Sequence, residues 1–284
     1  MKASDFISKL GSTLKSCIKI ALLSRCVAAP PRCGKKSDSV VILGNGPSLK
    51  ATVASDVDLL KALPCVAVNF MANAPEYELI RPDYYVLADP HFFIGIEHDN
   101  VASLWKNIAR SSWPVVLCVP AKMRSKAKDL LGNAPNVTVS AFNFVGAEGF
   151  GWFERFVYRR RLAMPRPRNV LIPAIMVAIA AGYKDIYLCG ADHSWLETIR
   201  VSDENHVISV QPHFYADSKK ELKRSETEYR GYHLHDILFS FYIAFRSYHT
   251  LERFAVKEGV KIFNATPGSF IDAFPRKSLP SYKF

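Results

Sequence analysis

Glycines and polar side chains that could bind an anionic ligand follow the apolar run at residues 40–43. In "VVILGNGPSLK" this run leads into Gly44, Asn45, Gly46 and then Ser48. The glycines would let backbone come close to another group, and Ser48 is placed to cap a helix that follows. The amino end of a helix after such a turn favours a phosphate. We therefore expect a nucleotide phosphate or base here, although the turn matches neither GxGxxG nor the P-loop pattern.

Three later apolar runs also end in side chains that could do chemistry. They lead into Asn69, Asp89 and Asp192, each of which is an ordinary turn former by itself. If Asp89 and Asp192 end neighbouring strands, as we expect, their carboxylates could hold Mg²⁺ against a triphosphate. Histidines near these ends allow a second interpretation as a transition-metal site, although no HxxxH spacing supports it: His91, His193 and His213.

Short β-rich runs alternate with helical patterns along most of the chain. The predicted strands are 40–43, 65–69, 84–89, 115–119, 137–142, 185–190 and 260–265. The predicted helices are 48–62, 99–110, 121–131, 171–182 and 235–258. This alternation predicts the α/β class, with a Rossmann-like, mostly parallel sheet and helices on both faces. Because ligands bind at the carboxyl ends of such strands, the polar ends should converge on one site.

Two segments interrupt the alternation. Residues 145–168 carry a basic run and two prolines, and residues 192–234 are polar and rich in His and Tyr. Long excursions inside a compact domain are commonly lids or binding loops. We interpret residues 192–234 as a lid within a single domain at 39–284, preceded by a basic helix and linker at 1–38.

The N-terminal segment is a basic amphipathic pattern. Its apolar residues recur at helical spacing, and Asp5 is the acid among five basic residues before residue 26: Lys2, Lys9, Lys15, Lys19 and Arg25. Such a helix can lie on an anionic membrane or pack against the domain, and both interpretations remain open. The basic residues interrupt any apolar core of a signal peptide, which makes a cleaved leader the weaker interpretation.

Composition sets further bounds. The net charge of +11 suits nucleic acid, an anionic membrane or a phosphorylated substrate, but no nucleic-acid-binding motif accompanies the basic run at 159–161. No stretch has the roughly 18 to 20 apolar residues of a transmembrane helix. The six cysteines form no CxxC pair, and Cys65, Cys118 and Cys189 lie in apolar runs. We expect free thiols in a reducing cytosol.

The motifs together resemble a known enzyme family. "VVILGNGPSLK", "AVNFMAN", "DYYVLADPHFF", "VAIAAGYKDIYLCGAD" and "KIFNATPGS" follow the order found in bacterial lipooligosaccharide sialyltransferases, glycosyltransferase family 42, over about residues 38 to 272. The resemblance implies that the turn binds a cytidine monophosphate sugar donor, through Asn45, Ser48 and Asn69. It also implies a general-base histidine after the lid, for which His233 and His235 in "GYHLHDI" are candidates, His233 slightly favoured.

The sequence departs from this family at three places. Asp89-Pro90 stands where the family has Asn-Pro, and Asn169 begins the stretch that matches a Thr-Ser-Gly. A family tyrosine that stabilises the leaving phosphate is replaced by Ser194, and Tyr215 in the lid could substitute for it. These changes leave a different donor sugar open.

A second family shares "GNGPSL" and "GYKDIYLCGAD". The sequence is also similar to the archaeal 6-hydroxymethylpterin diphosphokinase domain, which implies ATP and Mg²⁺. A non-catalytic glycan-binding protein is a third interpretation. We favour an inverting, metal-independent glycosyltransferase of bacterial surface-polysaccharide assembly, moving a sugar to a glycan or lipid-linked acceptor. The expected location is the cytoplasm, with attachment to the inner face of the inner membrane if the N-terminal helix binds lipid.

Overall fold

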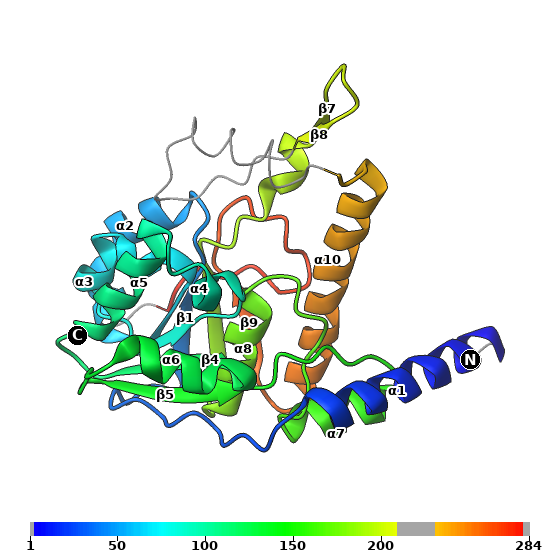
Figure 1. The fold of residues 1–284 in the computed structure, drawn as a ribbon, viewed down its shortest axis with the longest axis horizontal. Helices are drawn as coiled ribbons and strands as arrows, with labels where there is room; N and C mark the ends of the chain where they lie inside the picture. The colour runs from blue at the N-terminus through cyan, green and yellow to red at the C-terminus, as the bar shows by residue number, and fades with distance from the viewer. Residues whose placement is uncertain (1–2, 209–230, 281–284) are drawn as a thin grey trace.

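The computed structural model describes residues 3–208 and 231–280 (Figure 1). Within them a single parallel sheet runs in the order β5-β4-β3-β2-β1-β6-β9. Its strands are β1 (Ser39–Leu43), β2 (Cys65–Val68), β3 (Tyr84–Val86), β4 (Val115–Pro120), β5 (Val137–Phe142), β6 (Asp185–Cys189) and β9 (Lys261–Asn264). The predicted α/β class and all seven predicted strands are confirmed, with ends shifted by up to three residues.

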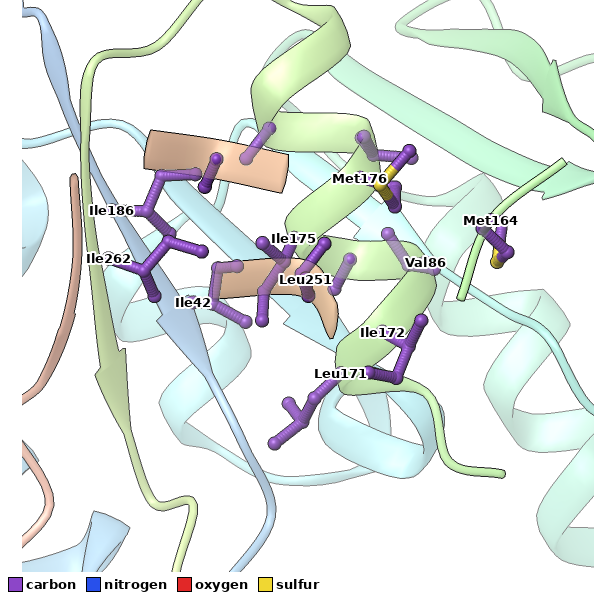
Figure 2. Packing of buried hydrophobic residues seen from close by; sticks show 14 of the residues in the cluster. Ile42, Val86, Met164, Leu171, Ile172, Ile175, Met176, Ile186, Leu251 and Ile262 are labelled. Atoms are coloured by element: carbon purple, nitrogen blue, oxygen red, sulfur yellow. The ribbon is translucent and has the colours of Figure 1, made fainter. Parts of the chain in front are cut away.

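Helices cover both faces of the sheet because each central strand is apolar on both sides. Val40 and Ile42 of β1 belong to one core and Val41 and Leu43 to the other. The first core packs under α7 (Gly151–Arg159), α8 (Leu171–Ala180) and α10 (Leu234–Lys257), as Figure 2 shows for part of it. The second packs under α2 (Leu49–Ala62), α3 (Glu76–Ile80), α5 (Asp99–Ala109) and α6 (Arg124–Leu131).

The chain reverses its direction of travel across the sheet beside β1. Strands β1 to β5 are added outward on one side, and β6 then pairs with the other edge of β1, with Val41 opposite Tyr187. The chain segments that follow β1 and β6 therefore lead to helices on opposite faces of the sheet. Such a topological switch leaves a crevice where ligands bind in open α/β sheets.

Two segments contain more structure than the sequence indicated. The interruption at 145–168 includes α7, whose residues Phe153 and Val157 are buried one turn apart. Its two prolines follow the helix and do not break it. The first part of the lid forms η3 (Ser194–Thr198) and an antiparallel pair, β7 (Arg200–Val201) and β8 (Val207–Ile208). The rest of the lid, 209–230, lies outside the described residues.

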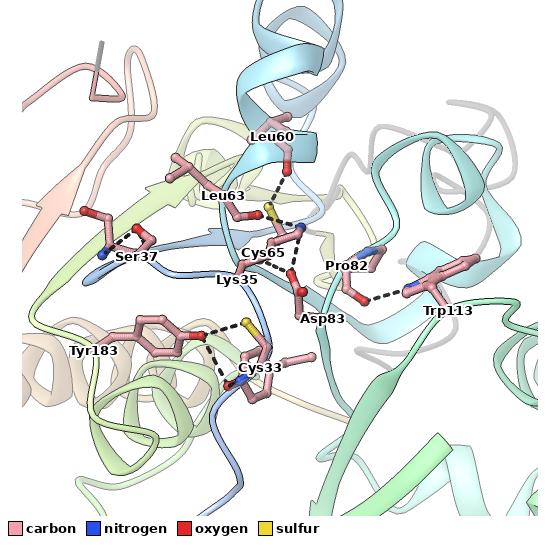
Figure 3. Close-up of polar contacts among 12 residues, drawn as sticks. Cys33, Lys35, Ser37, Leu60, Leu63, Cys65, Pro82, Asp83, Trp113 and Tyr183 are labelled. Atoms are coloured by element: carbon pink, nitrogen blue, oxygen red, sulfur yellow. Dashed lines mark hydrogen bonds and ion pairs between the residues drawn. The ribbon is translucent and has the colours of Figure 1, made fainter. Parts of the chain in front are cut away.

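The linker before β1 is attached to the domain. Lys35 Nζ lies 3.0 Å from Asp83 Oδ2 and 2.9 Å from the Leu63 carbonyl oxygen, and Cys33 Sγ lies 3.2 Å from the Tyr183 hydroxyl (Figure 3). The helix before it, α1 (Ala3–Leu23), runs beside α7 (Figure 1). None of the helices in the described part of the chain has the length and apolar character needed to cross a bilayer.

The cysteine prediction is confirmed for the strand residues. Cys65, Cys118 and Cys189 are free and buried. Burial raises the pKa of the Cys118 and Cys189 thiols to about 12. These thiols are protonated packing groups.

Candidate functional site

A cavity of about 1160 Å³ lies at the carboxyl end of the sheet, at the switch between β1 and β6. The loops after β1, β2, β3 and β6 line it together with the amino end of α8 and the first turns of α10. The predicted site residues that it brings together are Gly44, Asn45, Gly46, Asn69, Asp89, Asn169 and Asp192. The convergence expected from the parallel sheet is therefore present.

The glycines of the first turn allow close contact with another loop of the protein itself. A Cβ on Gly44 would lie 2.4 Å from the Gly190 carbonyl oxygen, and one on Gly46 would lie 1.9 Å from Asp192 Oδ2. Gly190 has a φ of 63°, and a Cβ there would lie 2.4 Å from the Gly44 oxygen. The group that comes close to these glycines is the loop after β6, which also forms the cavity wall.

The amino end of α2 carries a carboxylate of the protein itself. Ser48 Oγ donates to Asp192 Oδ2 at 2.8 Å, and the Ser48 backbone N–H donates to Oδ1 at 3.2 Å. Burial raises the pKa of Asp192, and the Ser48 hydrogen bonds oppose that shift. The expectation that Ser48 caps α2 through its side chain is wrong, since its hydroxyl makes no cap hydrogen bond. Ser48 is also absent from the cavity lining.

Two asparagines shape the wall formed by β1 and β2. Asn45 is buried, and its Nδ2 donates to the Val68 carbonyl oxygen at 3.1 Å. This bond ties the turn after β1 to the end of β2. Asn69 has a φ of 50°, in the left-handed region that asparagine tolerates better than most residues. Its conformation turns the chain out of β2 at the edge of the cavity.

The expectation that Asp89 and Asp192 end neighbouring strands is wrong. They follow β3 and β6, which β2 and β1 separate. Three strand spacings amount to about 14 Å, whereas one Mg²⁺ needs its ligands about 2 Å away. Asp89 Oδ1 instead accepts the His91 backbone N–H at 2.8 Å. Among the described residues, no group of three or more His, Cys, Asp or Glu side chains is placed to hold a metal ion.

A buried hydrogen-bond chain crosses from the loop after β6 to α8. His193 Nε2 lies 2.7 Å from the Tyr248 hydroxyl, which donates to Asn169 Oδ1 at 2.9 Å. The hydroxyl has one proton to give, so His193 carries its proton on Nε2. Asn169 Oδ1 also accepts the Leu171 N–H at 3.0 Å. Asn169 Nδ2 is buried without a hydrogen-bond partner among the described residues.

Burial lowers the pKa of His193 to about 3. The ring stacks on Trp195, with centroids 4.1 Å apart, and a neutral ring suits that apolar position. His193 is therefore a neutral structural donor at neutral pH and a poor general base. Its place in the transition-metal interpretation is not supported by these contacts.

The two histidines predicted as bases lie beside the cavity rather than in its wall. His233 precedes α10 and His235 lies in its first turn; both are exposed, and neither lines the cavity. Asp236 does line it, and its Oδ2 accepts the His233 backbone N–H at 3.0 Å. The His235 Nε2 lies 3.4 Å from Asp236 Oδ1. Tyr215 falls outside the described residues.

Sequence reasoning missed several residues of the wall. Arg168 contributes a permanent positive charge and Asp236 contributes a carboxylate; aromatic and hydroxyl side chains also face the cavity: Phe144, Trp195, Tyr232, Phe239 and Ser240. Asp236 could have been found as the acid in the first turn of a predicted helix that follows the lid. Arg168 gave no such signal, because it stands in a run of arginines and prolines.

The fold and the cavity define a class: a Rossmann-like α/β protein with a ligand cavity at its topological switch. No family model and no curated protein matches the sequence. Among solved structures, the chain is similar to the MAf glycosyltransferase from Magnetospirillum magneticum AMB-1, with a TM-score of 0.50 and 11% identity. The match covers 95% of this chain and 38% of that one, so this chain spans less than half of that protein's length. At this identity the likeness concerns the fold.

Proposed function

We propose that this chain is a glycosyltransferase that binds a nucleotide-activated sugar in the cavity between β1 and β6. The observation that carries the proposal is the convergence of four strand ends with polar side chains on one cavity at the topological switch. Its volume of about 1160 Å³ leaves room for a nucleotide sugar and part of an acceptor. The similar solved structure is named as a glycosyltransferase, which supports the same class here.

The donor is proposed to occupy the side of the cavity between β1 and α8. Arg168 and the amino end of α8 both favour negative charge there. They can stabilise the leaving nucleotide phosphate without a metal ion. Among nucleotide sugars we propose a cytidine monophosphate sugar as the donor, because the motif resemblance favours it.

The acceptor is proposed to enter beside α10. Inverting transfer requires a base that takes the proton of the acceptor hydroxyl. The hydroxyl oxygen forms a bond to the sugar carbon, and the nucleotide departs with the electrons of its own bond to that carbon. Asp236 is the carboxylate of α10 that reaches the cavity wall, with His233 and His235 beside it. We propose Asp236 as the base, and the two histidines as the alternatives that the sequence predicts.

Thermal shift with a panel of nucleotides tests the proposed function. The panel contains cytidine monophosphate, uridine diphosphate, guanosine diphosphate, and ATP with and without Mg²⁺. A ligand at a hundredfold excess over its Kd stabilises the folded protein by about 2.7 kcal/mol. We expect stabilisation by a cytidine nucleotide without Mg²⁺. Stabilisation by ATP with Mg²⁺ alone would move the assignment to diphosphoryl transfer, and no stabilisation by any of these nucleotides would contradict the proposed function.

Three variants separate the candidate bases. Once a donor is known, Asp236→Asn should lower kcat by about 100- to 10,000-fold if Asp236 removes the proton. His233→Asn and His235→Asn should cost much less, because both side chains lie outside the cavity lining. The kcat values at a saturating donor concentration, with the donor Kd as the control, decide the matter. A loss confined to His233→Asn would assign the base to that histidine and contradict our choice.

A further inference from the structure

The N-terminal helix α1 is attached to the domain by its small polar side chains. Thr13 and Ser16 are its buried residues. Ser16 Oγ donates to the Glu148 carbonyl oxygen at 2.8 Å, and Thr13 Oγ1 accepts the Phe150 backbone N–H at 3.1 Å. A Cβ on Gly149 would lie 2.1 Å from Thr13 Oγ1 and 3.0 Å from Thr13 Cα, so α1 lies close to the chain at Gly149.

The apolar face of the same helix is left uncovered. Leu10, Leu14, Ile18 and Leu22 repeat every four residues and are 42%, 57%, 61% and 68% exposed. We call these four residues the α1 stripe. A surface helix normally buries its apolar face and leaves the polar face in water. Helix α1 does the reverse, so the stripe is available to another apolar phase.

The stripe continues onto α7 through aromatic rings. Phe6 of α1 lies 5.4 Å from the Phe150 ring, and Phe150 stacks with Trp152 at 6.4 Å. Trp152 and Phe156, one turn apart on α7, are 70% and 53% exposed. Figure 1 shows α1 running beside α7 at the end of the molecule away from the lid hairpin. The two helices thus present one exposed apolar surface.

Basic side chains border this surface. At about 100° per residue, Lys15 and Lys19 follow the α1 stripe on the side away from Thr13. The Arg160 guanidinium lies 5.7 Å from the centre of the exposed Phe156 ring. A second copy of the chain is a poor occupant, because pairing two stripes would bring the lysines of both copies together. An anionic lipid surface complements both the charge and the apolar side chains.

We infer that α1 and α7 together form a binding surface for an anionic membrane, with the α1 stripe, Trp152 and Phe156 entering the interface. The inference goes beyond the proposed function and does not depend on what the cavity binds. The sequence left membrane binding and packing against the domain open as alternatives for this helix; in the inference they combine, because α1 is docked on the domain and its outer face remains exposed. Tryptophan at such a position is typical of membrane interfaces.

Vesicle co-sedimentation of the full chain tests the inference. Vesicles of phosphatidylcholine mixed with phosphatidylglycerol are compared with vesicles of phosphatidylcholine alone. The test variant carries Leu10→Gln, Leu14→Gln and Ile18→Gln, and the matched control carries Leu79→Gln and Ile94→Gln, which are exposed elsewhere. We expect the wild type and the control to bind the anionic vesicles and the stripe variant to lose at least about ten-fold in affinity. Replacing Lys15 or Lys19 by Gln should weaken binding about five-fold each.

Tryptophan emission gives a second readout. Binding to anionic vesicles should shift the emission of the wild type to the blue, and Trp152→Phe should remove most of that shift. Circular dichroism of each variant checks that the helices remain folded. The inference is overturned if the wild type ignores anionic vesicles or if the stripe variant binds as well as the control. It is also overturned if the wild type is a dimer in the absence of lipid and the stripe variant is a monomer.

Discussion

At the scale of single residues, the contact between Gly44 and Gly190 holds the two halves of the cavity wall together. The turns after β1 and β6 meet backbone to backbone, where no Cβ fits. Gly44→Ala would push a methyl group against a carbonyl oxygen that cannot move independently. We expect a loss of about 1 to 3 kcal/mol in the free energy of unfolding, measured by urea denaturation.

Gly11→Ala is the matched control for that prediction. Gly11 lies in α1 with nothing near the position of a new Cβ. Alanine is the better helix former, so this variant should be at least as stable as the wild type. Equal stability of Gly44→Ala and Gly11→Ala would show that the two turns can separate without cost.

His193 should make the folded protein sensitive to acid. Its pKa is about 3 in the folded state, against about 6.5 for an exposed histidine. Between these values the unfolded chain binds more protons, so stability rises with pH. This contribution is complete above about pH 6.5 and is lost as the pH falls toward 3, at about 1.4 kcal/mol per pH unit.

Urea denaturation at two pH values measures the effect. His193→Gln removes the titrating ring. The drop in unfolding free energy between about pH 7 and about pH 5 should be roughly 2 kcal/mol smaller in this variant than in the wild type. Because Asp192 and other groups titrate in both proteins, the difference of the two drops isolates His193. An identical drop would mean that the ring takes up a proton without unfolding.

The site residues that follow directly after a strand were predictable from the sequence. Contacts between residues far apart in the sequence were not. Asn45, Asn69, Asp89 and Asp192 stand at strand ends, so the topology alone brought them to one edge. The pairing of Ser48 with Asp192 joins residues 144 positions apart, and no local spacing encodes it. The Asp192 carboxylate accepts the Ser48 backbone N–H at the amino end of α2, and a phosphate site there stays a prediction.

At the scale of elements, the linker before β1 acts as part of the domain. Asp83 is 12% exposed, and it accepts hydrogen bonds from Lys35 Nζ and the Cys65 backbone N–H. Lys35→Met would leave a mostly buried carboxylate with one partner. We expect a loss of about 1 to 3 kcal/mol in unfolding free energy, measured by urea denaturation.

Lys61→Met provides the control, because Lys61 pairs with Asp58 on the open surface at 3.8 Å. Exposed pairs contribute about 0 to 1 kcal/mol. If both variants lose equally little unfolding free energy, the linker does not contribute to the stability of the domain.

Long elements were predictable from periodicity, and short ones were not. The strands of the sheet are apolar runs bounded by turn residues, and α2, α5, α8 and α10 repeat apolar residues over several turns. Helix α3 and helix α4 (His91–Ile94) span five and four residues, too few to show a period. Helix α7 was hidden by the arginines and prolines beside it. The order of the strands could not be read at all, because it depends on which edge of β1 the sixth strand meets.

At the scale of the whole molecule, the two cores share every central strand. Opening the core under α8 exposes the same strands that support the core under α5. We therefore expect one cooperative unfolding transition for the sheet and the helices on both of its faces. Fluorescence of Trp105 and Trp113, which lie in one core, should follow the same urea curve as the far-ultraviolet circular dichroism. Two separated curves would show that the helical layers unfold independently.

The position of β6 against β1 also has a consequence for biosynthesis. Strand β1 ends at Leu43, and its second neighbour in the sheet, β6, begins at Asp185 and is made much later. Through the synthesis of the residues between them, one edge of an apolar strand has no partner in the sheet. Domains generally fold from the N-terminus as the chain emerges, at about 5 to 20 residues per second. The nascent protein therefore carries an open, aggregation-prone edge for about 7 to 28 seconds, and the cavity is completed only after α10 has also been made.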